Sequence, residues 1–101
     1  MRILVMFDLP STTSLDLREY RRFRQFLIKN GFIMMQESIY TKLTLSPSSA
    51  ELARNQVRKF IPQDGLVQMI TITEKQFQNM ELLVGKVQTT YIDSLERVIE
   101  L

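Results

Sequence analysis

Asp8 is the residue whose type and position most clearly suggest chemistry. It follows the apolar run of residues 2–7 and precedes Leu9 and Pro10, so its carboxylate stands at the end of a strand-like segment. An acid at the rim of a sheet, on a rigid element, is well placed to hold a hard metal ion such as Mg²⁺. One Asp supplies too few ligands for this, so two copies in a dimer and phosphate oxygens would have to complete the site. The alternative is a turn residue that bonds nearby backbone amides.

A group of basic residues is the second feature that suggests chemistry. Residues 15–30 have helical periodicity, with aromatic and aliphatic residues on one side and cations on the opposite arc. Acidic partners are scarce along that arc, and arginine, which outnumbers lysine there, binds phosphate through its forked donors. An ordinary solvated face is the more common explanation of such a pattern in a single helix. The four cations are Arg18, Arg21, Arg22 and Lys29, with Arg24 on the flank and Arg54, Arg58 and Lys59 on the next predicted helix.

The composition limits the chemistry that is possible. The 101 residues include 13 Lys and Arg against 11 Asp and Glu, a net charge of +2, and 45% are hydrophobic, as in one small globular domain. The absence of Cys and His excludes disulfides, thiolate metal sites and a histidine base. The sequence contains no signal peptide pattern and no apolar stretch of membrane-spanning length, so we expect a cytoplasmic protein.

The elements that position these residues alternate between strands and helices. Residues 2–7 form a continuous apolar run typical of a central strand, and residues 15–30 form a helix capped by Thr13 or Ser14. Residues 32–43 are predicted to form a second strand with a bulge or bend in its middle.

The second half of the chain continues the alternation. A capping-box pattern from Ser48 to Glu51 predicts a helix that runs to residue 60, and residues 66–73 alternate as a strand does. A helical turn to residue 80 and a short strand at residues 81–85 follow.

This order predicts an α+β fold, the ferredoxin-like βαββαβ arrangement with additional C-terminal strands. Residues 1–80 would form the domain, and residues 81–101 an extension. Both helices would cover one face of an antiparallel sheet, and the other face would be bare although its strands are apolar on both sides. A second copy is the simplest cover, so we expect a homodimer whose sheets pack face to face.

The residues themselves resemble a known family. Residues 3–10, an apolar strand that ends in an Asp, are similar to the first strand of the CRISPR-associated Cas2 family. Residues 18–27, 31–32, 36–42 and 70–77 resemble the type II-A branch of that family. The similarity is collinear and spans most of residues 1–80.

The resemblance implies a function. Members of the family form homodimers through their sheets, and a C-terminal strand, here residues 82–84 or 97–101, commonly reaches the other subunit's sheet. The family's proposed Mg²⁺ ligand maps onto Asp8, and members are described as metal-dependent endonucleases on RNA or double-stranded DNA. The family also bridges two dimers of a partner integrase during spacer acquisition. Its basic first helix contacts the incoming DNA, and the matching residues here are Arg18, Arg21, Arg22 and Lys29.

Two main hypotheses follow. In the first, the dimer is a scaffold that holds duplex DNA while the integrase performs the chemistry; the lack of His and of further acids near Asp8 favours it. In the second, the protein is itself a Mg²⁺-dependent endonuclease acting on RNA or DNA through Asp8. A weaker third possibility is a ferredoxin-like regulatory domain that binds a small ligand. Such a domain does not require a basic helix.

Overall fold

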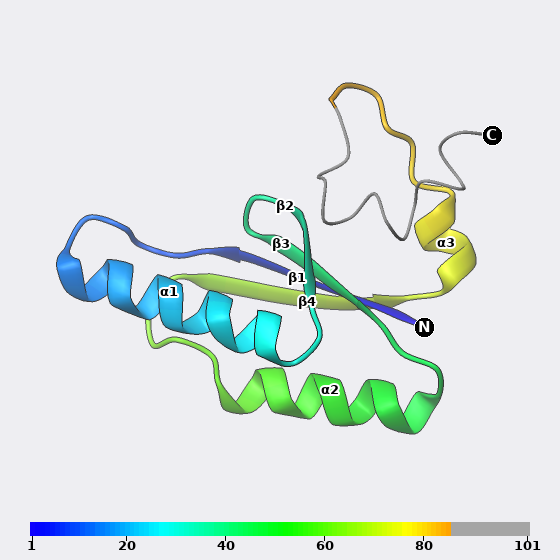
Figure 1. Ribbon diagram of the computed structural model, residues 1–101, viewed down its shortest axis with the longest axis horizontal. Helices are drawn as coiled ribbons and strands as arrows, with labels where there is room; N and C mark the ends of the chain where they lie inside the picture. The colour runs from blue at the N-terminus through cyan, green and yellow to red at the C-terminus, as the bar shows by residue number, and fades with distance from the viewer. Residues whose placement is uncertain (86–101) are drawn as a thin grey trace.

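The computed structural model describes residues 1–85, which form four strands and three helices (Figure 1). This confirms the predicted α+β class. In chain order the elements are β1 (Arg2–Asp8), α1 (Ser14–Lys29), β2 (Ile33–Gln36), β3 (Ile39–Leu43), α2 (Pro47–Lys59), β4 (Leu66–Ile72) and α3 (Glu74–Gln78).

The strands form one antiparallel sheet in the order β2-β3-β1-β4. β1 is central, and its Val5 lies opposite Tyr40 of β3 on one side and Met69 of β4 on the other. Figure 1 shows α1 and α2 running along the same face of this sheet. The arrangement is the ferredoxin-like one that the order of elements predicted.

The main core lies between this face and the two helices. Side chains alternate along a strand, so Ile3, Val5 and Phe7 of β1 all point toward α1 and α2. α1 contributes Phe23 and Leu27, as its periodicity predicted. The other buried members are Phe32, Tyr40, Ala50, Ala53 and Val57.

The opposite face, called here the open face, is only partly covered by other parts of residues 1–85. Leu4 of β1 is buried there against Phe77 of α3. On the neighbouring β4, Ile70, opposite Leu4, is 49% exposed, and Leu66, opposite Asp8, is 54% exposed. Within residues 1–85 this face is thus apolar and incompletely covered, as expected, and its cover by a second copy stays a prediction.

The helix starts are set by side-chain caps. Thr13 caps α1: its hydroxyl accepts a hydrogen bond from the Asp16 amide at 3.0 Å, and the Thr13 amide donates to the Asp16 carboxylate at 3.1 Å. α2 begins two residues earlier than the predicted capping box, because Ser46 is its cap and reciprocates with Ser49. Pro47 explains the difference, since its fixed φ and missing N–H suit the first helical position.

Two strand predictions were wrong. Residues 32–43 form a hairpin, β2 and β3, instead of one bent strand. Ser38 adopts a φ of 64° in the turn, and the expected irregularity is a register shift between Met34 and Gln36. Residues 81–85 form no strand within this chain. The predicted crossing to another subunit at residues 82–84 concerns a second chain and stays a prediction, and the alternative segment, residues 97–101, lies outside the described residues.

Candidate functional site

Asp8 is the last residue of β1 and is exposed. It lies opposite Leu66, at the start of β4. Because Phe7 points into the helix-covered core, alternation places Asp8 on the open face, together with Leu4. The predicted position at the end of a central strand is thus correct, and the structure adds that this acid shares the face that a second sheet would cover.

Gly65 supports the end of β1 through a close approach. Its φ is +95°, a left-handed conformation that favours glycine. A Cβ at this position would lie 2.7 Å from the carbonyl oxygen of Asp8 and 2.8 Å from Cδ2 of Leu9. Sequence patterns do not reveal this requirement, because the neighbour that requires a glycine, Asp8, is distant in the sequence.

Residues 1–85 supply only one carboxylate toward the expected Mg²⁺ site, that of Asp8. Within residues 1–85 there is no group of three or more His, Cys, Asp or Glu residues placed to hold a metal ion. The Asp8 carboxylate also has no hydrogen-bond partner within that part of the chain, so it is available as a ligand. Mg²⁺ commonly takes one or two carboxylates together with water and phosphate oxygens. Asp8 therefore fits such an ion only if a second copy and a phosphate group contribute.

The predicted basic residues are all exposed on α1, but their surroundings differ. Arg18, Arg21 and Lys29 form no ion pair with any residue in 1–85. Arg22 does have neighbours: its guanidinium lies 4.0 Å from the carboxylate of Glu19 on the same helix and 4.8 Å from the ring centroid of Phe60, although its side chain is 62% exposed. Three of the four predicted cations are thus free of protein partners in the described chain.

Arg24 is a fifth cation on α1 that the sequence placed only on the flank of the set. Its Nε donates a hydrogen bond to the hydroxyl of Tyr40 at 2.8 Å. Tyr40 belongs to β3, so no pattern within α1 identifies this contact.

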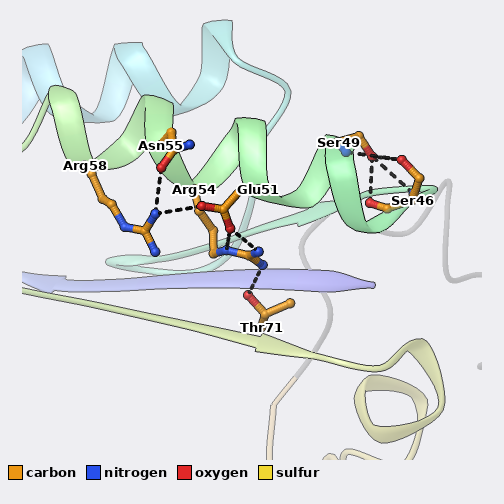
Figure 2. Close-up of polar contacts among 7 residues, drawn as sticks. All are labelled: Ser46, Ser49, Glu51, Arg54, Asn55, Arg58 and Thr71. Carbon is orange, nitrogen blue, oxygen red and sulfur yellow. Dashed lines mark hydrogen bonds and ion pairs between the residues drawn. The ribbon is translucent and has the colours of Figure 1, made fainter.

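The two arginines of α2 share one acidic partner. Arg54 and Arg58 approach the carboxylate of Glu51 at 2.5 Å and 3.3 Å (Figure 2). Arg54 also donates to Thr71 of β4 at 3.0 Å, and Arg58 to Asn55 at 2.7 Å. The hydrogen bond from Arg54 is the main cause that holds the pKa of Glu51 below its ordinary value. α2 therefore adds less available positive charge than its sequence suggested.

The structure separates the acid from the basic helix. Asp8 lies on the open face, whereas α1 packs on the opposite face against Phe7 and its neighbours. One chain consequently presents two distinct candidate sites: a single carboxylate beside an apolar surface, and an exposed row of cations on a helix.

These features define a ferredoxin-like protein with a strand-end acid and a basic first helix. The family model described as CRISPR associated protein Cas2 matches residues 1–80, and the chain belongs to this family. None of the helices within residues 1–85 has the length and apolar character needed to cross a membrane.

Two relatives illustrate the similarity. The CRISPR-associated endoribonuclease Cas2 of Treponema denticola is 42% identical over 101 residues, which is 100% of both chains. The protein of the same name from Ligilactobacillus salivarius is 43% identical over 99 residues, 98% of each chain. The crystal structure of Streptococcus pyogenes Cas2 superimposes with a TM-score of 0.62 at 15% identity, covering 83% of this chain and 100% of that one, and supports the fold. The type II-A assignment stays a prediction.

Proposed function

We propose that this protein is a homodimeric subunit of CRISPR adaptation that binds duplex DNA and bridges dimers of a partner integrase, which performs the chemistry. The observation that carries the proposal is the set of exposed cations Arg18, Arg21 and Lys29, which have no acidic partner within residues 1–85. Contacts of this kind to phosphates position a duplex without reading its sequence. A two-fold axis would present the same row twice.

The open face supports the dimeric part of the proposal. Half-exposed Leu66 and Ile70 of β4 lie on the same face as Asp8, Leu66 opposite Asp8 itself and Ile70 opposite Leu4. A second copy of the sheet would remove this apolar surface from water, which is the dominant favourable contribution to association. The α1 helices would then face outward on both sides, where a long polyanion has access to them.

Integration in vitro tests the scaffold. The full-length protein is combined with its integrase, a short duplex and a CRISPR array, and Arg18→Ala/Arg21→Ala is compared with Asp8→Ala. We expect integration to fail with the arginine pair and to proceed with Asp8→Ala, each variant first being shown to form the wild-type oligomer. Arg58→Ala is the matched control, because that arginine already has the Glu51 carboxylate as a partner. Failure of Asp8→Ala as a folded dimer would overturn the scaffold proposal.

The second candidate is a Mg²⁺-dependent endonuclease, an endoribonuclease or a deoxyribonuclease. Two observations favour it: the relatives bear the name endoribonuclease, and Asp8 has a carboxylate without a partner within residues 1–85, on the face where a second copy would dock. Asp8 of each copy would hold the ion, which when bound would activate water for phosphodiester hydrolysis.

Cleavage assays separate this candidate from the scaffold. RNA and double-stranded DNA are incubated with the protein while Mg²⁺ is titrated, and Asp8→Asn is run beside the wild type. Cleavage that requires Mg²⁺ and is lost in Asp8→Asn establishes the endonuclease. Cleavage that persists in Asp8→Asn indicates a contaminating enzyme and removes this candidate.

A further inference from the structure

We infer that Arg24 is an anchored contact for a backbone phosphate of nucleic acid, and that Tyr40 is the residue that positions it. The inference rests on the proposed binding of nucleic acid by α1. It adds to that proposal one further arginine, which is not among the four cations predicted to bind nucleic acid. It also adds the hydrogen bond that holds this arginine in place.

The anchor is a fixed hydroxyl. Tyr40 is only 1% exposed, and its ring stacks on Phe7 with centroids 5.7 Å apart and an interplanar angle of 22°. Phe7 is in turn held by edge contacts with Tyr20 and Phe23 of α1. The ring cluster therefore fixes the position of the Tyr40 hydroxyl, to which Nε of Arg24 donates at 2.8 Å.

The rest of the Arg24 guanidinium remains available. An arginine has five N–H donors, and the bond to Tyr40 uses the one on Nε. Within residues 1–85, Nη1 and Nη2 form no hydrogen bond or ion pair, and Arg24 is exposed on α1. The four remaining donors form the planar end that pairs with phosphate oxygens.

No other arginine of the described chain combines these properties. Arg2 is buried, and Arg54 and Arg58 have Glu51 as a partner. Arg22 lies against Glu19 and Phe60.

The exposed arginines without partners lack an anchor. Arg18 and Arg21 have no hydrogen bond from their side chains to residues in 1–85, so binding would have to order them. Arg24 is already ordered in part, and a side chain that is ordered in advance loses less conformational freedom when it binds.

A purely structural role for Arg24 would be to satisfy the buried Tyr40 hydroxyl. If this were its only role, substitutions of Arg24 and Tyr40 would lower folding stability, but their effects on nucleic-acid binding would be independent of each other. A double-mutant cycle measured on binding distinguishes the two, because it isolates the energy that Tyr40 contributes through Arg24.

The experiment measures the dissociation constant of a short labelled duplex by fluorescence anisotropy over a range of salt concentrations. The full-length dimer is compared with Arg24→Gln, Tyr40→Phe and the double variant, with Arg58→Gln as a control for the loss of one arginine. Tyr40→Phe should weaken binding about two- to tenfold, the cost of ordering one side chain. Arg24→Gln should weaken it more and reduce the salt dependence by about one phosphate contact. In the Arg24→Gln background, Tyr40→Phe should have no further effect.

Arg24→Lys is a second variant that keeps the charge and loses the Nε donor. It should bind less tightly than the wild type and be insensitive to Tyr40→Phe. The series is run with DNA and with RNA duplexes of one sequence, and coupling in either polymer supports the inference.

The outcomes separate the inference from the proposed function. The inference is wrong if Tyr40→Phe does not weaken binding. It is also wrong if Tyr40→Phe weakens binding as much in the Arg24→Gln background as in the wild-type background. In either case the proposed function stands. If the wild type shows no salt-dependent binding to either duplex, both are overturned.

Discussion

Arg2 and Glu74 join the first residue of the central strand to the first residue of α3. Nη2 of Arg2 lies 2.6 Å from Oε1 of Glu74, and Nε lies 3.2 Å from Oε2, so the pair is bidentate. The guanidinium also stacks on the Phe77 ring at 4.2 Å from its centroid. These contacts hold α3 near the end of the sheet where β1 begins, whereas Asp8 is the last residue of that strand.

Loss of the Glu74 carboxylate should destabilise the fold. The Arg2 side chain is 11% exposed and that of Glu74 is 33% exposed, so Glu74→Gln leaves a largely buried cation without its counterion. We expect a loss of about 1–3 kcal/mol in the free energy of unfolding, measured by urea denaturation. Glu37→Gln, at an exposed position, should change it by less than about 0.5 kcal/mol. Equal stability of the two variants would show that the pair does not hold α3.

Gly65→Ala should be more damaging than Gly31→Ala, although both glycines have a positive φ. At Gly31 a Cβ would meet only the flexible end of the Lys42 side chain at 3.4 Å, so the cost is the backbone strain of about 1–2 kcal/mol. At Gly65 the Cβ would meet the backbone of Asp8, which adds about 1–3 kcal/mol of steric strain. Denaturation of both variants at one protein concentration tests the difference. Similar losses would show that β1 accommodates the methyl group and that Gly65 does not position Asp8.

Asp16 should make stability depend on pH. The hydrogen bond from the Thr13 backbone is the largest cause that lowers the pKa of Asp16 from its ordinary 3.8, and Thr12 donates a further one. Because the pKa is lower in the folded state, the charged carboxylate stabilises the fold above pH 3.8, and this stabilisation is lost as the pH falls through the folded-state value.

The variant Asp16→Asn tests this dependence. It should be less stable than the wild type at neutral pH, and the difference should close well below pH 3.8, as followed by thermal denaturation. Asp64→Asn is a suitable control, since its exposed side chain makes no hydrogen bond within residues 1–85. A stability difference that stays constant over this pH range would contradict the assignment.

Ile70→Asp should disrupt the expected homodimer. Ile70 is 49% exposed at the centre of β4 on the open face, opposite Leu4. Loss of one buried isoleucine on association would weaken the dimer at least tenfold, or about 1.5 kcal/mol or more, and a charge there adds to this. Analytical ultracentrifugation over a range of protein concentrations measures the effect. Gln25→Asp, on the helix-covered side, should leave the dimer intact; an unchanged dimer in Ile70→Asp would place the interface elsewhere.

The sequence by itself determined the order of the elements and the fold class. The periodicity of residues 15–30 identified the apolar side of α1, where Phe23 and Leu27 are buried, and the apolar run before Asp8 placed that acid at the end of a central strand. These features depend on residues close together in the chain, where side-chain spacing and turn residues determine local structure. The same evidence located Arg18, Arg21 and Lys29 on an exposed helical arc.

Only the tertiary structure decided which groups are free and which are held. Arg24 meets Tyr40, Arg54 meets Thr71, and Arg2 meets Glu74 across 16, 17 and 72 residues of sequence, distances over which periodicity carries no information. The separation of Asp8 from α1 also depends on the tertiary structure, since a strand's two faces become distinct environments only when helices cover one of them.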